Sequence, residues 1–317
     1  MMVWGLATLG LVILLLAGDS LVKGAVNLSL RMGIPALIVS LTIVAFGTSA
    51  PELLIGISAV MEGKPGLALG NVVGSNTANI LLVLGIPAMI SVLHTSQCDT
   101  RKTYLFMLGS TVLFIALALF GTFNLISAAV LLAALAFVLG DAFRDVHRHR
   151  KACSVVVDDV DGLEGADPDM PWWQILLFLA LGLIGLPLGA DILVDNASII
   201  AAQYGVSDSA IGLTLVAVGT SLPELATTVM AALRKQADVA LGNVIGSNMF
   251  NLLAIIGVTS IVAPIPVDPE FLQFDLWVML AASLLLVPFV FWGRDISRGW
   301  GVGLTVTYLA YVTAILI

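Results

Sequence analysis

The chain has 317 residues, of which 59% are hydrophobic and only 11% are charged, and its mean hydropathy is +1.08. Soluble domains carry about 25% charged residues, so this composition excludes a soluble domain and indicates a polytopic membrane protein. The formal net charge of −8 affects solubility and long-range fields, and it does not locate a site.

Apolar segments long enough to cross a bilayer recur along the chain. A membrane helix needs about 20 mainly apolar residues, and by that measure the sequence predicts an all-α integral membrane protein with ten transmembrane helices. We expect the first segment to be retained, because it has no basic stretch before it and no small-residue cleavage site. The expected spans are 3–31, 35–61, 66–93, 103–120, 124–143, 171–203, 208–233, 238–262, 271–292 and 299–317.

The basic residues indicate the orientation of these helices. If the loops alternate between the two sides, all 13 Lys and Arg residues except Lys64 fall on one side. Short loops rich in Lys and Arg stay cytoplasmic. We therefore expect a multi-pass protein of the cell (inner) membrane with both termini outside. Cys98 and Cys153 then lie in the cytoplasm, where a disulfide is disfavoured.

Two stretches of the sequence repeat each other without a gap. Residues 41–85 align with residues 213–257 at a constant offset of 172, that is, 220 − 48. We therefore expect two five-helix units, residues 1–143 and 171–317. Because five is odd, the second unit enters the membrane from the opposite side, and inverted repeats with polar, interrupted helices are typical of secondary transporters with a midplane site.

Residues 144–170 form the expected cytoplasmic linker between the two units. The linker begins with basic residues and continues with acidic ones. A regulatory cation site is conceivable there, but acidic linkers are usually just solvated. The segment also lacks the glycine and terminal glutamate of a calcium-binding loop, so the solvated interpretation is favoured.

The repeated motif places a carboxylate among apolar residues. In the first copy, VAFGTSAPELL, Thr48 and Ser49 precede Glu52 by four and three residues, so two hydroxyls and a carboxylate share a helix face. Pro51 has no N–H and frees the carbonyl of Gly47. Freed backbone oxygen in a bilayer requires protein or a watery cavity beside it. The motif thus offers oxygen ligands of the kind that Na+ and Ca2+ bind.

A second polar block follows in each half. In GNVVGSNTAN, Ser75 and Asn79 are four residues apart and share a face, and the glycines allow another helix to approach closely. The remaining amides of the two blocks are interpreted either as ligands or as hydrogen-bonding contacts between helices, and the sequence leaves both open. They are Asn71, Asn76, Asn243 and Asn248.

Glu52 and Glu224 are the only acids in the apolar middle of the four motif helices, and no Lys or Arg lies there to neutralise them. Burying a carboxylate in the membrane costs free energy, and such a residue is normally functional. A cation from solution is therefore the expected partner. Two carboxylates match one Ca2+, a set of Na+ ions or two protons, and like charges in a low-dielectric cavity make protons credible competitors. The symmetric Asp19 and Asp191 lie nearer the helix ends and are interpreted as vestibule or packing residues first.

The paired GTSAPE/GTSLPE and GNVVGSN/GNVIGSN blocks resemble the two α-repeats of the cation/Ca2+ exchanger superfamily, in its sodium/calcium exchanger branch. The resemblance implies a calcium/sodium antiporter that works by alternating access, with helices one and six sliding across helices two, three, seven and eight. It implies no enzymatic activity and no cofactor. The implied partners are Ca2+, Na+ and the lipid bilayer; no nucleic acid is expected, and a monomer suffices because one chain supplies both halves of the site.

The resemblance also implies the ion ligands. The glutamates would bind Ca2+, and hydroxyls and carbonyls would form flanking Na+ sites, with the two ions competing for two carboxylates. Some relatives, notably K+-dependent ones, have aspartate at Asn79 or Asn251, so this chain is expected to be K+-independent. The implied set is Thr48, Ser49, Glu52, Ser75 and Asn79, their counterparts Thr220, Ser221, Glu224, Ser247 and Asn251, and the main-chain oxygens of Ala45 and Ala217.

Other functions are weighed against this one. Ca2+/H+ exchange and K+-dependent exchange are the alternatives within the superfamily, and the neutral second blocks disfavour the first. A cation channel is the main alternative from another class, but channels usually form a pore by oligomeric symmetry, whereas this chain builds a pseudo-symmetric site within itself. An intramembrane hydrolase is remoter, because no histidine or lysine base occurs in the spans that carry the serines.

Overall fold

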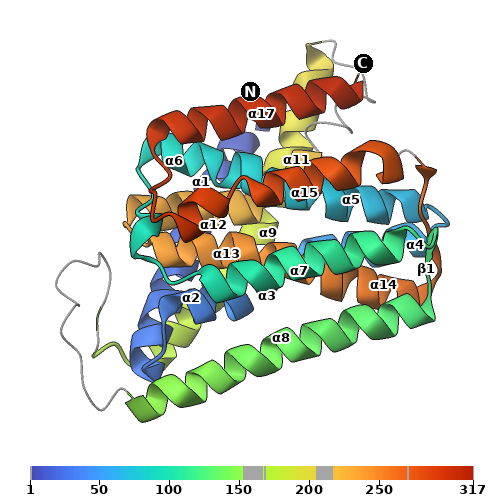
Figure 1. The fold of residues 1–317 in the computed structure, drawn as a ribbon. Coiled ribbons are helices and arrows are strands. Elements are labelled where there is room, and N and C mark those ends of the chain that lie inside the picture. Colours follow the sequence, from blue (N-terminus) through green and yellow to red (C-terminus); the bar gives the residue numbers. More distant parts are fainter. Residues whose placement is uncertain (1, 153–166, 168, 205–216, 270, 317) are drawn as a thin grey trace.

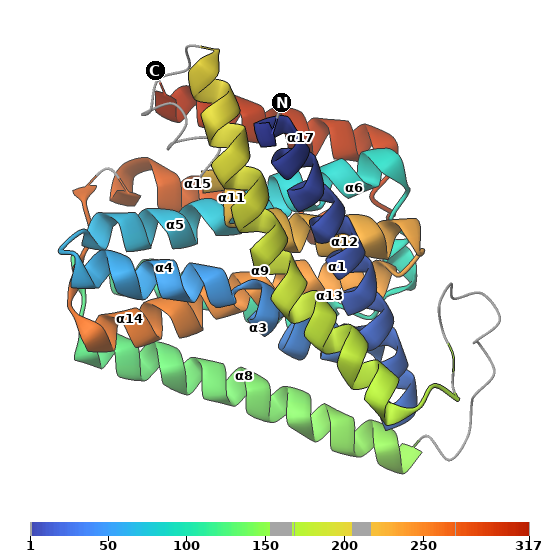
Figure 2. The ribbon, with the colours of Figure 1, turned by 180° about the vertical axis from the view of Figure 1, so that it is seen from behind.

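The computed structural model describes residues 2–152, 167, 169–204, 217–269 and 271–316. Two long helices, α1 (Met2–Met32) and α9 (Trp172–Gln203), lie side by side and cross one face of the other helices obliquely (Figure 2). Two further long helices, α8 and α17, run along opposite edges of the molecule (Figure 1). The motif helices lie between these edges.

The elements occur in the following order. Between α1 and α9 they are α2 (Ala36–Val39), the π-helix η1 (Ser40–Val44), α3 (Ala45–Thr48), α4 (Ala50–Met61), α5 (Pro65–Ala78), the π-helix η2 (Asn79–Val83), α6 (Gly85–Ile90), the 3-10 helix η3 (Thr95–Gln97), α7 (Arg101–Ala118), β1 (Thr122–Phe123) and α8 (Leu125–Ala152). After α9 they are α11 (Ala217–Gly219), α12 (Leu222–Leu233), α13 (Ala237–Met249), the π-helix η5 (Phe250–Ile255), α14 (Ile256–Val262), β2 (Ile265–Pro266), the π-helix η6 (Phe271–Asp275), α15 (Leu276–Leu284), α16 (Val287–Phe291) and α17 (Arg298–Leu316). The strands β1 and β2 pair antiparallel, with Thr122 opposite Pro266.

The helices confirm an all-helical membrane protein. Among the described residues, seven helices are long and apolar enough to cross a membrane, or up to eight if the bent pair Ala36–Thr48 and Ala50–Met61 forms one span. The expected span 299–317 corresponds to α17, which has 19 residues. Part of the expected span 208–233 lies outside the described residues, and its described helix is α12.

The expected span 124–143 corresponds to the apolar segment Leu125–Asp145, and the helix that carries it is longer than the span. The sequence predicts that the span 124–143 ends where the basic linker begins, but α8 continues to Ala152. Its sequence contains no proline or glycine after Gly140 that would stop a helix, and Lys102 of α7 forms ion pairs with Asp141 and, at 2.7 Å, with Asp145 of α8. Residues 153–166 and 168 of the linker, which include Cys153 and most of its acidic residues, lie outside the described residues.

The two copies of the motif have the same local structure. The first copy bends by 41° between α3 and α4, at Ser49, whose backbone angles are φ −87° and ψ 3°. Ser221 has almost the same angles, φ −89° and ψ 4°, immediately before α12. Pro51 and Pro223 each lie in the first turn of the following helix, where a missing N–H is tolerated. The helix is therefore interrupted just before the proline in both copies.

Small residues set the distance between α1 and α9. A Cβ atom on Gly10 would lie 2.6 Å from the backbone nitrogen of Leu193, and one on Gly182 would lie 2.5 Å from Cβ of Leu21. Such distances leave no room for a side chain, so the two antiparallel backbones touch. In the same way, Gly246 of α13 brings that helix against the carbonyl of Leu41 in η1. This second contact places the second polar block against the first motif.

Candidate functional site

The two intramembrane glutamates occupy equivalent places. Glu52 is the third residue of α4 and Glu224 the third residue of α12, and the side chains of both are completely buried. Ser49, three residues before Glu52, donates to Glu224, so the two motifs meet. Among the described residues, no group of three or more His, Cys, Asp or Glu side chains could hold a metal ion. The site therefore depends on two carboxylates and on neutral oxygen atoms.

Glu224 accepts hydrogen bonds from both halves of the chain. Its Oε1 atom accepts from Ser49 Oγ at 3.3 Å and from Ser247 Oγ at 3.3 Å. Thr48 Oγ1 lies 3.3 Å from Ser247 Oγ and 3.3 Å from the carbonyl oxygen of Ala45. The structure thus brings the first motif together with the second polar block, although 199 positions separate Thr48 from Ser247 in the sequence.

Many of the expected ligand atoms are buried without a hydrogen-bond partner. An unpartnered polar atom in the protein interior costs free energy, and a cation would relieve that cost at each oxygen, so the donor set fits hard cations. The unpartnered atoms at expected ligands are both carboxylate oxygens of Glu52, Oε2 of Glu224, the hydroxyls of Ser75 and Ser221, Oδ1 of Asn79, and both amide atoms of Asn251.

The remaining expected ligands lie nearby in the chain. Thr220 donates from Oγ1 to Asn71 Oδ1 at 3.3 Å, so it contacts the polar block of the opposite half. Ala45 begins α3 and is buried. Ala217 begins α11.

The asparagines that the sequence left open connect helices. Asn76 Nδ2 donates to the carbonyl of Asn248 at 3.2 Å, and Asn248 Nδ2 donates to the carbonyl of Asn76 at 3.3 Å. Asn79 Nδ2 also donates to Asn248 Oδ1, at 3.0 Å. Asn243 Nδ2 donates to the carbonyl of Glu224 and to Thr228 Oγ1. The sequence did not single out Thr228, although its counterpart Gly56 breaks the repeat and could have drawn attention to it.

The two symmetric aspartates have different surroundings. Asp19 forms an ion pair with Arg234, with 2.6 Å between Oδ1 and Nε, which joins α1 to the end of α12. Asp191 is exposed. The counterpart of Arg234 is Glu62, whose pKa is lowered by a hydrogen bond from Lys64. The packing role expected for Asp19 is present on one side only.

Breaking this ion pair has an expected cost. Arg234→Met keeps the apolar stem but leaves Asp19 without the guanidinium, so we expect the free energy of unfolding to fall by about 1 kcal/mol, because the pair is partly exposed. Thermal unfolding of the detergent-solubilised protein measures this change. Lys235→Met, at an exposed neighbouring position, is the control, and equal melting temperatures for the two variants would contradict the prediction.

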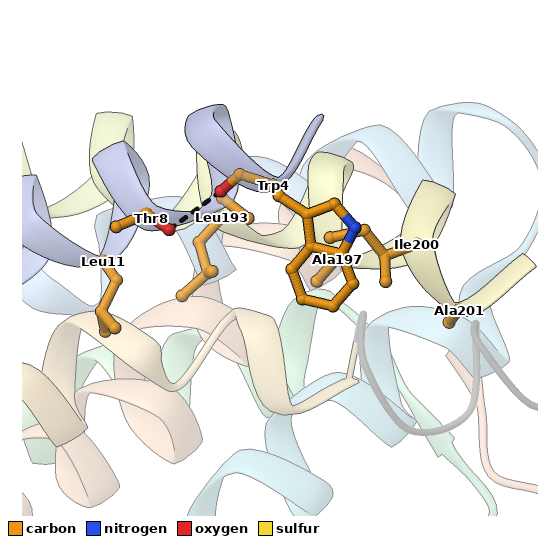
Figure 3. A pocket seen from close by; sticks show the side chains of 8 residues that line it. Trp4, Thr8, Leu11, Leu193, Ala197, Ile200 and Ala201 are labelled. Atoms are coloured by element: carbon orange, nitrogen blue, oxygen red, sulfur yellow. Dashed lines mark hydrogen bonds between the residues drawn. The ribbon is translucent and has the colours of Figure 1, made fainter. Parts of the chain in front are cut away.

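A groove in the described part of the chain is lined by neither glutamate. It has a volume of about 360 Å³ and lies between the first turns of α1 and the last turns of α9 (Figure 3). Trp4, Leu11, Leu193 and Ile200 line it, and Thr8 donates its hydroxyl proton to the carbonyl of Trp4. Because the lining is apolar, this groove suits hydrocarbon and not a cation.

Comparison with known proteins agrees with this geometry. The sequence profile of the family described as "Sodium/calcium exchanger protein" matches residues 2–141 and 174–317. The chain belongs to the sodium/calcium exchanger family. CaxA of Alkalimonas amylolytica is 36% identical over 284 residues, which cover 88% of this chain and 86% of CaxA. The sodium/calcium exchanger MaX1 of Methanosarcina acetivorans is 32% identical over 342 residues, which cover 97% and 96% of the two chains.

A solved structure supports the membership of this exchanger in the family. The sodium-calcium exchanger NCX_Mj superposes with a TM-score of 0.81 at 31% sequence identity, covering 99% of this chain and 98% of that one. The family consists of transporters. This exchanger is therefore a multi-pass membrane protein and a cation antiporter of the sodium/calcium branch.

Proposed function

We propose that this exchanger carries Ca2+ in one direction and Na+ in the other by alternating access, without K+, through the site around Glu52 and Glu224. The observation that carries the proposal is the pair of completely buried carboxylates with three oxygens that have no hydrogen-bond partner. A charge of −2 in a buried site needs cations, and one Ca2+ or several Na+ ions supply them.

The proposed ligands divide by charge. The carboxylates of Glu52 and Glu224, aided by Ser75, Ser247, Asn79 and Asn251, bind Ca2+, because a divalent ion needs both negative charges. Neutral oxygens suit the flanking Na+ sites: Thr48, Ser49 and the carbonyl of Ala45 form one, and Thr220, Ser221 and the carbonyl of Ala217 form the other. Ca2+ and Na+ need the same two carboxylates to balance their charge. The bound Ca2+ and the bound set of Na+ ions therefore exclude each other.

The proposed architecture is a pair of inverted five-helix repeats, residues 1–143 and 171–317. The reciprocal hydrogen bonds of Asn76 and Asn248, which are 172 residues apart, are what a twofold relation between the repeats requires. The bond from Thr48 to Asn243 and the bond from Thr220 to Asn71 form a second such set. In the cell membrane, both termini face the outside of the cell and the segment 144–170 lies in the cytoplasm. A monomer suffices, because one chain supplies both halves of the site.

The hydrogen bonding supports two alternating states. Glu224 is held by Ser49 and Ser247, whereas Glu52 and the corresponding Ser221 and Ser75 have buried oxygens without partners. Two halves with nearly the same sequence thus differ in their hydrogen bonding. Exchanging these roles between the halves would give a second state of similar energy, which alternating access needs.

The charge of the site accounts for transport without K+. Asn79 and Asn251 are neutral, so the site holds two negative charges and not three or four. These match one Ca2+ without a further monovalent ion.

The test is Ca2+ uptake by proteoliposomes that contain the purified protein and internal Na+. Uptake should require the outward Na+ gradient, and it should be the same whether the Na+-free external medium contains choline or K+. Uptake driven by a proton gradient without Na+ would assign Ca2+/H+ exchange, and uptake without any counter-ion would assign a channel. Either result would overturn the proposal.

A further inference from the structure

The hydrogen bonds around Asn243 form a directed chain from α12 to Thr48. Thr228 Oγ1 donates to the carbonyl of Glu224 at 2.7 Å. Asn243 Nδ2 lies 3.3 Å from that carbonyl and 3.2 Å from Thr228 Oγ1. Asn243 Oδ1 accepts from Thr48 Oγ1 at 3.3 Å. Asn243 and Thr228 are completely buried, so water does not compete for these contacts.

The orientation of the Asn243 amide follows from what its neighbours can do. The carbonyl of Glu224 can only accept, and the Thr228 hydroxyl has already used its proton on that carbonyl, so both groups require a donor. The amide nitrogen must therefore face α12. The amide oxygen then faces Thr48, and because that oxygen can only accept, the proton of Thr48 points towards it.

This orientation matters for the atoms that would bind an ion. Thr48 has one hydroxyl proton and three oxygen atoms 3.3 Å away that can accept it, which are Asn243 Oδ1, the carbonyl of Ala45 and Ser247 Oγ. When the proton goes to Asn243, the lone pairs of Thr48 and the carbonyl of Ala45 are both available. When it goes to Ala45, that carbonyl is occupied. Ser247 Oγ, whose own proton goes to Glu224, can also accept from Thr48, but Ser247 is itself a proposed ligand of the ion, whereas Asn243 is held from the side of α12.

The first half of the chain lacks the corresponding anchor. Thr220 donates to Asn71 Oδ1, as Thr48 donates to Asn243, but the counterpart of Thr228 is Gly56, which has no hydroxyl. In agreement, Asn71 Nδ2 is buried without a hydrogen-bond partner. The amide orientation is thus enforced from two sides in one half only.

We infer that Asn243, anchored by Thr228, is a positioning residue that turns the Thr48 proton away from the ion and keeps the Thr48 hydroxyl and the Ala45 carbonyl open for Na+. The inference rests on the proposed function, and it adds that these two neutral oxygens determine Na+ affinity and not Ca2+ affinity. Neither Asn243 nor Thr228 contacts the ion.

The test compares two adjacent threonines of α12. Thr227 and Thr228 are both completely buried, and each donates to the carbonyl four residues earlier, Pro223 and Glu224 respectively. Thr228→Val and Thr227→Val therefore remove the same group and the same kind of bond. Only Thr228→Val also removes an acceptor from Asn243.

Two exchange reactions separate the ions in proteoliposomes. Na+-driven Ca2+ efflux gives the half-saturating Na+ concentration, and Ca2+/Ca2+ exchange without Na+ gives the KM for Ca2+. We expect Thr228→Val to raise the half-saturating Na+ concentration about threefold to tenfold, the effect of losing one buried hydrogen bond, with the KM for Ca2+ changed less than about twofold. Thr227→Val should change neither value, and Thr228→Ser should restore the Na+ value.

Several results would overturn the inference. These are equal Na+ values for Thr228→Val and Thr227→Val, a parallel rise in both constants for Thr228→Val, and no rescue by Thr228→Ser. Failure of the proposed function would appear in the wild-type protein, as absent exchange. In that case Na+ binding is measured in detergent, as the increase in melting temperature when NaCl replaces choline chloride. The inference stands if this increase is smaller in Thr228→Val than in Thr227→Val, and it falls otherwise.

Discussion

Glu52→Gln and Glu224→Gln are each expected to abolish Na+-dependent Ca2+ uptake, with a loss of at least about a hundredfold. Glutamine keeps the size and hydrogen-bonding shape of glutamate and removes one of two negative charges in a completely buried site. A unit charge at about 4 Å is worth about 4 kcal/mol even at an effective dielectric constant of about 20, and a divalent ion feels twice that. Initial rates of radioactive Ca2+ uptake into proteoliposomes measure the loss.

A third carboxylate provides the control for this experiment. Glu62 follows the last residue of α4, is exposed and pairs with Lys64, so Glu62→Gln should transport at close to the normal rate. Neither buried variant loses a hydrogen bond, because the amide oxygen in Glu224→Gln can still accept from Ser49 and Ser247 and the Glu52 carboxylate has no donor to lose. The loss of transport should therefore not come from unfolding. Near-normal uptake by either buried variant would remove the central claim about the site.

Asn248→Ala is expected to destabilise the protein by about 2 kcal/mol more than Asn76→Ala. Both changes create the same cavity and remove one half of the reciprocal amide pair. Asn248 also accepts from Asn79, however, so its loss leaves the buried Asn79 amide nitrogen without a partner. Leaving such a group unsatisfied costs about 1–3 kcal/mol, although hydrogen bonds in membrane proteins lie towards the low end of such values.

Thermal unfolding in detergent, followed by intrinsic fluorescence, compares these two variants directly. The wild-type protein and each variant are measured at the same Na+ concentration, because a bound ion stabilises the folded state. The same ranking should appear in transport, since Asn79 is a proposed ligand whose orientation depends on Asn248. A lower melting temperature for Asn76→Ala than for Asn248→Ala would show that the bond to Asn79 contributes nothing.

The hydrogen bonding gives the site an asymmetry that the repeat alone does not contain. Glu224 is held by two serine hydroxyls, and Asn243 is held by Thr228, while the equivalent groups around Glu52 and Asn71 lack partners. Part of this difference comes from the sequence, because the position equivalent to Thr228 in the first repeat is Gly56. The rest reflects the conformation, since Ser75 and Ser221 are present and yet their hydroxyls make no bond.

The sequence alone determined the helical membrane class, the family and the presence of two carboxylates among apolar residues. These conclusions depend on features that a chain displays locally: long apolar runs, a carboxylate three or four residues after two hydroxyls, and a repeat at constant spacing. The sequence also indicated a weakened hydrogen bond at the carbonyl of Gly47, because the effect of Pro51 acts within one turn. The repeat also revealed which residues correspond, and hence that Asn79 and Asn251 are neutral together.

Only the tertiary structure decided which groups meet. The bonds from Ser49 to Glu224 and from Thr48 to Asn243 join residues 175 and 195 positions apart, and they exist because Gly246 lets α13 approach η1. The ion pair between Asp145 of α8 and Lys102 of α7 joins two helices, and the pairing of Asp19 with Arg234 follows from the way α1 crosses α12. Spacing along a helix specifies a face, but the partner of that face is set by packing between distant segments, which the local pattern does not encode.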